Sequence, residues 1–359
     1  MKVCIIGNGL TALTLAKVLE KKDLLVDIFF TKKFKKSRNI RVLGISKSNT
    51  EYFNKEILNI ESISWKINTI KVFSETVSDN ELLKFSNPNK EIFSIIENQK
   101  LYNMIENDLR KRKKITFKQR HNPQDIFEDE NKLIINCDPY HPITKKYFSN
   151  DIRKNYNSYA YTALIKHKKI KNDTAVQIFT NNGPIAFLPL SNNKTSVVYS
   201  YKNFNLKNEV DIKKLIKEFN PKYEILDIIE SSKFELKSSH LRKYYDKNIL
   251  AFGDLLHKIH PHAGQGFNMT LRDIKQLSEL IDKKLDLGLD LNNSILGEFQ
   301  KKTKSGNFVF SAGIDFIYEI FNFERQIKNK FIIKSIKNIG KNKVVNKIFK
   351  KFADDGLRI

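Results

Sequence analysis

Apolar and polar positions along the chain are arranged in a way that predicts short buried strands, each followed by a helix. Residues 3–6 are apolar, and apolar positions in 12–19 then recur at helical spacing. The same order returns later, where the apolar run 249–252 is followed by a polar loop and by helical spacing over 267–281. A chain of 359 residues can bury a substantial core, so we expect one large α/β unit or two closely packed domains.

Further apolar runs predict the remaining elements. Strands are expected at 24–30, 65–72, 133–136, 175–179, 183–190 and 196–200. Helices are expected at 101–109, 211–219 and 308–323, and residues 277–284 are expected to finish the helix that starts near 267. The basic run 110–114 is expected to be the solvated end of the first of these helices. The middle region, about 159–241, is expected to form a sheet with helical inserts.

A glycine-containing turn joins the first predicted strand to the first predicted helix. It reads Gly7-Asn8-Gly9-Leu10-Thr11-Ala12 and matches a G-x-G-x-x-A fingerprint. Gly7 permits the tight turn, Gly9 lets the backbone approach a pyrophosphate, and Ala12 allows the helix to pack closely on the sheet. Its position directly after a strand predicts a dinucleotide site.

The end of the next predicted strand lacks the acidic residue that usually binds the ribose hydroxyls of a dinucleotide. Phe30 and Thr31 stand there, followed by Lys32 and Lys33. This departure weakens the adenosine end of the site, or shifts ribose binding to Thr31 or to a lysine.

A second glycine-containing segment lies in residues 249–273. It places Asp254 at the end of a predicted strand and Gly264-Gln265-Gly266 just before a predicted helix. Free N–H groups at a helix N-terminus favour an anion, and the two glycines let a flat ligand approach the backbone. A strand, loop and helix packed only for stability is the alternative, but Asp254, His260-Pro261 and Asn268 favour a binding site.

The same segment resembles the second FAD-binding segment of the flavoprotein aromatic hydroxylases, and most of all that of the ubiquinone-biosynthesis hydroxylases. Those proteins carry G-D/N-A-A-H/Q, then H-P, A-G-Q-G-F/L-N and L-R-D. This chain has Gly253-Asp254, His257, His260-Pro261, Ala263-Gly264-Gln265-Gly266-Phe267-Asn268 and Leu271-Arg272-Asp273. Further matches at 7–12, 41–46, 96–101, 133–138 and 183–190 extend the likeness over most of the chain.

The resemblance implies a fold similar to that of para-hydroxybenzoate hydroxylase. Such a fold is α/β, with a Rossmann-like FAD-binding domain built on a parallel sheet, an interleaved β-sheet substrate domain and C-terminal helices. The expected FAD-binding parts are 1–65, 91–150 and 243–285. The substrate sheet is expected at 66–90 and 151–242, and a helical region at 286–359.

The resemblance also implies FAD-dependent monooxygenation. In this class NAD(P)H reduces the flavin, and the reduced flavin uses O2 to hydroxylate an electron-rich ring. The expected substrate is a polyprenylated aromatic precursor of ubiquinone, and other quinone-biosynthesis proteins are candidate partners.

Individual residues take roles from the same resemblance. Arg41 lies beside the flavin in the family's R-A-L-A-L-S segment, and Asn98 occupies the place of an amide that contacts the flavin. Taken alone, Asn98 is typical of a helix N-cap. Phe187 and Pro189 are expected on the substrate side, although an apolar core would show the same pattern. His260 is the candidate for proton transfer, or it merely packs. The expected cofactor-binding residues are Gly7, Asn8, Gly9, Leu10, Thr11, Ala12, Arg41, Asn98, Asp254, Pro261, Gly264, Gln265, Gly266, Phe267 and Asn268.

Residue 139 departs from the family pattern. The family has an Asp-Gly pair in a motif tied to FAD and to the nicotinamide cofactor, whereas this chain has Asp138-Pro139. Proline lacks an N–H, so any ligand bond made by that group is lost. Two rivals stay open: another flavoprotein reaction such as prenyl-lipid reduction, and a weakly active or non-catalytic component of a quinone-biosynthesis complex. A halogenase is less favoured, because Trp65 is the single tryptophan and the expected pair is missing.

The charge of the chain bears on its partners. The net charge is +24, but the lysines are spread along the whole chain without a nucleic-acid-binding motif, so no nucleic acid is expected. An anionic membrane surface fits better. In 325–352, apolar residues and lysines follow an amphipathic pattern that contains no acid. A packed helix with a solvated lysine face is the alternative there.

The same composition indicates a cellular location. No apolar stretch is long enough to span a bilayer, and the first glycine turn interrupts the only N-terminal apolar run. Cys4 and Cys137 are too few for a disulfide framework or a metal site. We therefore expect a cytoplasmic protein without a bound metal, peripheral on the inner face of the membrane.

Overall fold

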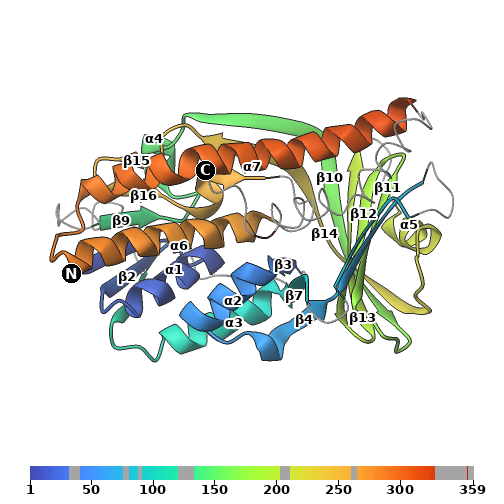
Figure 1. The fold of residues 1–359 in the computed structure, drawn as a ribbon, viewed down its shortest axis with the longest axis horizontal. Helices are drawn as coiled ribbons and strands as arrows, with labels where there is room; N and C mark the ends of the chain where they lie inside the picture. The colour runs from blue at the N-terminus through green and yellow to red at the C-terminus, as the bar shows by residue number, and fades with distance from the viewer. Residues whose placement is uncertain are drawn as a thin grey trace.

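The computed structural model describes residues 1–31, 41–75, 81–87, 91–119, 133–202, 211–259, 265–327 and 354. Within these residues the chain forms a six-stranded sheet, an eight-stranded sheet and a three-stranded sheet, together with several helices. In Figure 1 the six-stranded sheet and its helices occupy one side of the molecule and the eight-stranded sheet occupies the other. This mixture of elements confirms the α/β prediction.

The six-stranded sheet has the order β15-β16-β9-β1-β2-β8. All its strand pairs are parallel except the pair of β15 with β16. Strands β1, β9 and β16 are nearly continuous buried apolar runs, as expected for parallel strands that are covered on both faces. The bounds are Tyr245–Asp246 for β15, Ile249–Ala251 for β16, Leu133–Asn136 for β9, Lys2–Ile6 for β1, Leu25–Phe30 for β2 and Ile115–Gln119 for β8.

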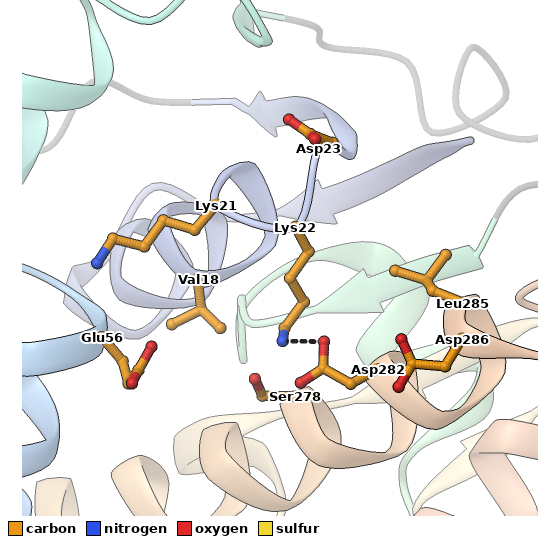
Figure 2. A pocket seen from close by; sticks show the side chains of 9 residues that line it. All are labelled: Val18, Lys21, Lys22, Asp23, Glu56, Ser278, Asp282, Leu285 and Asp286. Carbon is orange, nitrogen blue, oxygen red and sulfur yellow. Dashed lines mark hydrogen bonds and ion pairs between the residues drawn. The ribbon is translucent and has the colours of Figure 1, made fainter.

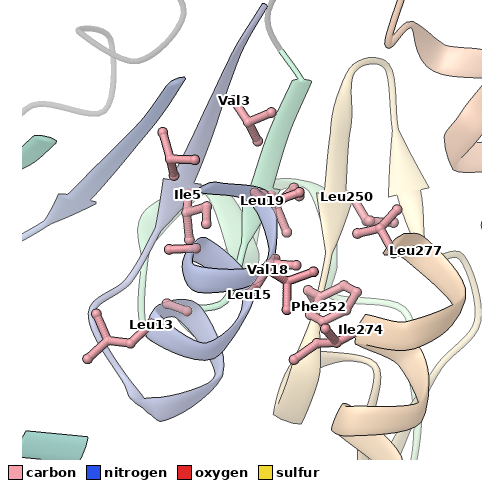
Figure 3. Packing of buried hydrophobic residues seen from close by; sticks show 14 of the residues in the cluster. Val3, Ile5, Leu13, Leu15, Val18, Leu19, Leu250, Phe252, Ile274 and Leu277 are labelled. Carbon is pink, nitrogen blue, oxygen red and sulfur yellow. The ribbon is translucent and has the colours of Figure 1, made fainter. Parts of the chain in front are cut away.

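The main hydrophobic core lies between this sheet and the helices α1 and α6. In Figure 3, Leu13, Leu15, Val18 and Leu19 of α1 pack beside Leu250, Phe252, Ile274 and Leu277. The helical spacing seen in the sequence thus marks the buried faces of both helices. The helices of this part are α1 (Leu10–Glu20), α3 (Asn98–Leu109), α4 (Pro142–Tyr147) and α6 (Gln265–Asp286).

The basic run 110–114 follows the end of α3, as predicted. Arg110 forms an ion pair with Glu106 at 2.6 Å, and Arg112 forms one with Asp108 at 2.8 Å. Both arginines are exposed. Each arginine is thus paired with an acidic residue one helical turn earlier, and the basic run needs no bound ligand to explain it.

The eight-stranded sheet has the order β17-β14-β10-β13-β12-β11-β5-β6 and is antiparallel except where β11 pairs with β5. Helix α5 (Ile212–Glu218) packs on one of its faces. The strand bounds are His257–Lys258 for β17, Ile225–Leu241 for β14, Asp151–His167 for β10, Lys194–Lys202 for β13, Gly183–Ser191 for β12, Thr174–Thr180 for β11, Thr69–Ser74 for β5 and Leu83–Ser86 for β6.

The three-stranded sheet lies between the two larger ones and has the order β3-β7-β4. Strands β4 and β5 together occupy the region where one strand, 65–72, was predicted, and each belongs to a different sheet. The bounds are Val42–Ser46 for β3, Phe93–Glu97 for β7 and Ser64–Ile67 for β4, with helix α2 at Lys47–Glu56.

Helix α7 (Asn293–Ile327) runs along both halves of the molecule (Figure 1). The predicted helix 308–323 is only part of it. Residues 300–307 are mostly polar, so the hydrophobic pattern did not indicate that the helix starts before them. Among the helices that the structure describes, none combines the length and apolar character needed to cross a bilayer. The basic stretch after Ile327 lies outside the described residues.

Candidate functional site

The first candidate site is the edge of the six-stranded sheet at which parallel strands end together. The register aligns Ile6, Asn136 and Ala251 at the ends of β1, β9 and β16. The segments that follow therefore leave the sheet side by side. The backbone N–H of Cys137 donates to Ile6 O at 2.8 Å, and that of Phe252 donates to Asn136 O at 2.9 Å. In an open α/β sheet, this carboxyl edge is where ligands bind.

The two glycine-containing segments, far apart in the sequence, meet at this edge. A Cβ atom added to Gly253 would lie 2.6 Å from Cγ2 of Thr11, and one added to Gly7 would lie 3.3 Å from Cβ of Asp138. Gly253 and Gly7 also have positive φ angles, +68° and +108°. Glycine is therefore required at both positions, by close contact and by backbone conformation.

The first turn of α1 has the features of an anion-binding site. Gly9 is its N-cap residue and supplies no side-chain hydrogen bond, and no acidic residue lies in the first turn. A Cβ atom added to Gly9 would meet nothing within 4 Å, so the space in front of this backbone is open. Leu10 and Thr11 are partly buried, Ala12 is fully buried, and Asn8 is engaged in an interaction of its own. An uncapped helix N-terminus behind an open glycine fits a pyrophosphate.

No acidic residue stands at the end of β2, in agreement with the sequence. The acid of this strand is Asp27, which is buried and forms ion pairs with Lys2 at 2.7 Å and Lys118 at 2.8 Å. Its carboxylate is thus committed to two neighbouring strands. Thr31 is the polar residue that follows the strand.

Asp138 and Pro139 form a tight turn after β9. The Asp138 carboxylate accepts a hydrogen bond from Tyr140 N at 2.8 Å, and its backbone oxygen accepts one from the Thr144 hydroxyl at 2.7 Å. Pro139 is exposed in this turn. The turn is stabilised internally, and proline fits it because no N–H is needed at that position.

Asp254 is exposed beside this turn and has no hydrogen-bond or ion-pair partner in the part of the chain that the structure describes. Its charge acts on a nearby thiol: desolvation, followed by the negative charges of Asp138 and Asp254, raises the pKa of Cys137. The two carboxylates therefore flank Cys137 at the carboxyl edge. An unpaired carboxylate at this edge can accept hydrogen bonds from the hydroxyl groups of a ligand.

Arg41 and Asn98 lie together at the junction of the sheets. The backbone N–H of Asn98 donates to Arg41 O at 2.9 Å, which links α3 to β3. The Arg41 guanidinium carbon lies 5.3 Å from the ring centroid of Phe234 in β14, so its exposed side chain reaches the eight-stranded sheet. The N-cap residue of α3 is Glu97, not Asn98, so the N-cap alternative for Asn98 is wrong by one residue.

Asn268 is buried in the first turns of α6 and fastens that helix to β3 and α2. Its Oδ1 accepts hydrogen bonds from Ser46 N at 2.9 Å and from Asn49 Nδ2 at 3.0 Å, and its Nδ2 donates to Gly44 O at 2.8 Å. The side chain thus fixes the position of the segment that carries Arg41. Any contact of Asn268 with a cofactor remains a prediction.

The predicted residues of the segment 260–268 fall partly within the described part of the chain. His260, Pro261 and Gly264 lie outside the described residues. Gln265 and Gly266 are the first residues of α6 and are partly buried, and Phe267 is buried in the main core. The predicted helix is therefore present from Gln265 on, so Gln265 and Gly266 lie in its first turn and not in a separate turn before it.

Phe187 and Pro189 both lie in β12 and are both buried. Phe187 has no exposed surface, packs with Ile212 and Ile216 of α5 and stacks on Tyr223 at a centroid distance of 6.0 Å. This packing supports the core alternative for Phe187. The opposite face of β12 carries Leu188 and Leu190, which pack with residues of the three-stranded sheet.

Sequence reasoning missed a buried polar cluster near this site. His257 Nε2 lies 2.5 Å from Asp273 Oδ2, and Asn307 Nδ2 donates to Asp273 Oδ1 at 2.9 Å. The pair joins β17 to α6, the elements that precede and follow residues 260–264 in the sequence. Both residues belong to quoted motifs, so their spacing was visible in the sequence, but their mutual contact was not.

A cavity of about 340 Å³ lies elsewhere (Figure 2). It is lined by Lys21, Lys22, Glu56, Ser278 and Asp282 among others, and Lys22 pairs with Asp282 inside it. Lys21 and Lys22 directly follow α1, Glu56 ends α2, and Ser278 and Asp282 lie in the second half of α6. The cavity is therefore at the opposite end of α1 from Gly9 and is not the predicted cofactor site.

Comparison with known proteins gives one family match and several relatives. Residues 93–286 match the model of the FAD binding domain family. The 3-demethoxyubiquinol 3-hydroxylase of Escherichia coli is 28% identical over 177 residues, which are 46% of this chain and 44% of that protein. The ubiquinone biosynthesis monooxygenase COQ6 of Dictyostelium discoideum is 26% identical over 262 residues, covering 58% of this chain and 52% of that protein. The chain thus spans about half the length of the curated relatives it matches.

Solved structures show the same fold over the full length. The p-nitrophenol 4-monooxygenase PnpA of Pseudomonas putida has a TM-score of 0.78 at 13% identity and covers 100% of both chains. The HpxO protein of Klebsiella pneumoniae, solved with FAD and uric acid, has a TM-score of 0.75 at 13% identity and covers 99% of this chain and 97% of its own. At these identities the likeness establishes the fold alone.

Proposed function

The chain belongs to the FAD binding domain family, and on that premise we propose that it is an FAD-dependent monooxygenase of the ubiquinone-hydroxylase type. The proposed reaction hydroxylates the aromatic ring of a polyprenylated ubiquinone precursor, with NAD(P)H as electron donor and O2 as oxidant. The relatives named for ubiquinone biosynthesis support this substrate class.

One observation carries the proposal: Thr11 of the first glycine turn contacts Gly253 of the second glycine-containing segment. A single flavin dinucleotide needs both a pyrophosphate site and a site for its ring system, and here two candidate segments share one sheet edge. The open space at Gly9 and the uncapped start of α1 fit the pyrophosphate.

Other residues at the sheet edge have separate proposed roles in binding the cofactor. Asp254 would accept hydrogen bonds from hydroxyl groups of the cofactor, and the start of α6 would favour the negative charge of a reduced flavin. Asn268 holds the segment with Arg41 against α6. When bound, FAD supplies the activation of O2, and the protein orients the ring and excludes water.

The substrate ring is expected between the eight-stranded and three-stranded sheets. Leu188 and Leu190 of β12 face that side together with Trp65 and Phe93. An apolar wall of this kind suits a ring that carries a long prenyl chain. A location at the inner face of the membrane completes the proposal, because such a substrate is dissolved in the bilayer.

The proposal is tested with purified protein. We expect it to take up FAD in a one-to-one ratio and turn yellow. Addition of NADH or NADPH without O2 should bleach the flavin, and admission of O2 with a demethoxyubiquinol analogue should give a product heavier by one oxygen atom. Bleaching without oxygen insertion would instead support another flavoprotein reaction, such as prenyl-lipid reduction.

A second candidate is a weakly active or non-catalytic component of a quinone-biosynthesis complex. It is favoured by the absence of a carboxylate at the end of β2 and by Pro139 in place of the family's glycine. Protein that stays colourless after incubation with excess FAD would support this candidate and reject the monooxygenase.

A further inference from the structure

Helix α7 turns three polar side chains inward between residues 307 and 315, alongside the buried Phe310 and Ile314. Asn307, Ser311 and Asp315 follow one another at one-turn spacing on the side that faces the protein. Asn307 donates to Asp273 at 2.9 Å, Ser311 Oγ lies 2.8 Å from His240 Nε2, and the Tyr156 hydroxyl donates to the Asp315 carboxylate. Each of these inward polar groups therefore has a partner on α6 or on the eight-stranded sheet.

The outer side of the same turns is apolar. Phe308, Val309 and Phe316 are 52%, 41% and 67% exposed, and the exposed Ala312 lies between them. Phe308 lies at the margin of this side, because its ring also packs edge-on against that of His240 at a centroid distance of 6.1 Å. Ile152 of β10 is 44% exposed and is the register partner of His240, so it lies on the sheet face that α7 covers. The usual arrangement of a surface helix, with apolar residues inside and polar residues outside, is partly reversed here.

Large apolar side chains that gather on one surface mark an interaction site more often than isolated ones do. Charge identifies the partner. Lys301, Lys302 and Lys304 are exposed on the preceding turns of α7. Lys154 of β10 adds no net charge beside the apolar turns, because it pairs with Glu319 at 3.2 Å, so the positive charge of this surface comes from the three lysines of α7. A second copy of a chain with a net charge of +24 is repelled, whereas an anionic bilayer is attracted.

We propose that the exposed side of α7, formed by Phe308, Val309 and Phe316 and flanked by Lys301, Lys302 and Lys304, docks on an anionic bilayer surface. The apolar residues enter the boundary between headgroups and acyl chains, and the lysines contact the lipid phosphates. The inference rests on the proposed function for its purpose, because a polyprenylated substrate must be taken from a bilayer.

The test measures co-sedimentation of the full chain with vesicles of phosphatidylcholine containing phosphatidylglycerol, and with vesicles of phosphatidylcholine alone. The double variant Phe308→Ser/Phe316→Ser is compared with Leu226→Ser/Leu289→Ser, which removes exposed leucines from outside this surface. We expect the first variant to bind anionic vesicles at least about tenfold more weakly, because each phenylalanine loses part of its burial energy. The control variant should bind like the unaltered chain. Added salt should weaken the binding of the unaltered chain and of both double variants to anionic vesicles.

Equal binding of both variants would overturn the proposal. So would a chain that ignores anionic vesicles but forms a dimer in analytical ultracentrifugation that Phe308→Ser/Phe316→Ser abolishes, since the surface would then bind a second copy. FAD affinity and NAD(P)H oxidation, measured without vesicles, report on the proposed function separately. A variant that retains both and loses only vesicle binding fits the α7 proposal.

Discussion

The glycines at the carboxyl edge differ in what surrounds them. Gly253 is pressed against Thr11, whereas the space in front of Gly9 is open. A close contact explains one glycine by packing, but open space does not explain the other. Gly9 is therefore the position at which the need for a ligand, rather than the need for a stable fold, accounts for the missing side chain.

This difference predicts opposite effects of two alanine substitutions. Gly9→Ala should change the free energy of unfolding by less than about 1 kcal/mol but weaken FAD binding at least about tenfold, or about 1.4 kcal/mol, because the methyl group occupies the approach to the backbone. Gly253→Ala should cost about 1–3 kcal/mol of stability through its backbone conformation alone. Urea unfolding without cofactor and an FAD titration measure the two effects. Unchanged FAD affinity in Gly9→Ala would remove the pyrophosphate from this turn.

A second prediction at this scale concerns pH. Burial, with a further contribution from His257, lowers the pKa of His240, while Asp315 acts in the opposite direction. The unfolded chain therefore binds a proton at His240 at a higher pH than the folded chain does, and stability is lost as pH falls below the ordinary histidine pKa of about 6.5.

We expect the free energy of unfolding to fall between about pH 7 and about pH 5, and to fall less in the variant His240→Gln. His141, whose pKa burial also lowers, should leave part of the decline in place. An identical pH dependence in the two proteins would show that His240 titrates normally in the folded chain.

Single residues also show which features of the site could be predicted from the sequence and which could not. The identity of Gly7 and Gly9 as turn residues followed from their place after an apolar strand. The orientation of Phe187 did not follow, because β12 is apolar on both faces and alternation cannot distinguish the side under α5 from the side facing the three-stranded sheet. The contact between His257 and Asp273 likewise depends on how β17 and α6 are brought together.

At the scale of elements, α6 is held to the three-stranded sheet by one buried side chain. Asn268 bonds with Gly44 and Ser46 of β3 and with Asn49 of α2. These bonds connect α6, whose first turn contains Gln265 and Gly266, with the strand that follows Arg41. Asn268 therefore helps to position Arg41, together with the bond from Asn98 N to Arg41 O and the pairing of β3 with β7.

The variant Asn268→Ala should lower the free energy of unfolding by about 1–3 kcal/mol or more, because buried backbone groups lose their partners. Asn103→Ala is a matched control, since Asn103 lies in the interior of α3 and bonds only with Gln99 in the described part of the chain. Chemical denaturation compares the two. Equal stabilities would mean that the α6–β3 junction does not depend on this amide.

Most of the helices and strands that were predicted individually lie within one or two residues of their predicted ends, because apolar periodicity directly reflects burial. Helix α2 and strands β7, β8, β10 and β14 were not predicted individually. Strand β9 occupies the predicted residues, and α5 differs by one residue at each end. The exceptions have physical causes. Polar residues are directed inward on α7, and β4 and β5 divide one apolar stretch between two sheets.

At the scale of the whole molecule, the order of the strands could not be read from the sequence. Strands β1, β9 and β16 are distant in the sequence, yet they are neighbours in the sheet and their last residues are in register. That arrangement places the 7–12 turn beside residues 253–254, as a shared cofactor site requires. The resemblance to FAD-dependent hydroxylases implied such an arrangement, while hydrophobic periodicity alone did not.

The central claim is that one FAD molecule binds along this shared edge. A crystal structure of the protein grown with FAD tests it most directly. We predict the pyrophosphate at the start of α1 beside Gly9, and the ring system on the side of Arg41 and the start of α6. FAD bound at any other surface, or a chain that crystallises without FAD from a solution saturated with it, would contradict the account.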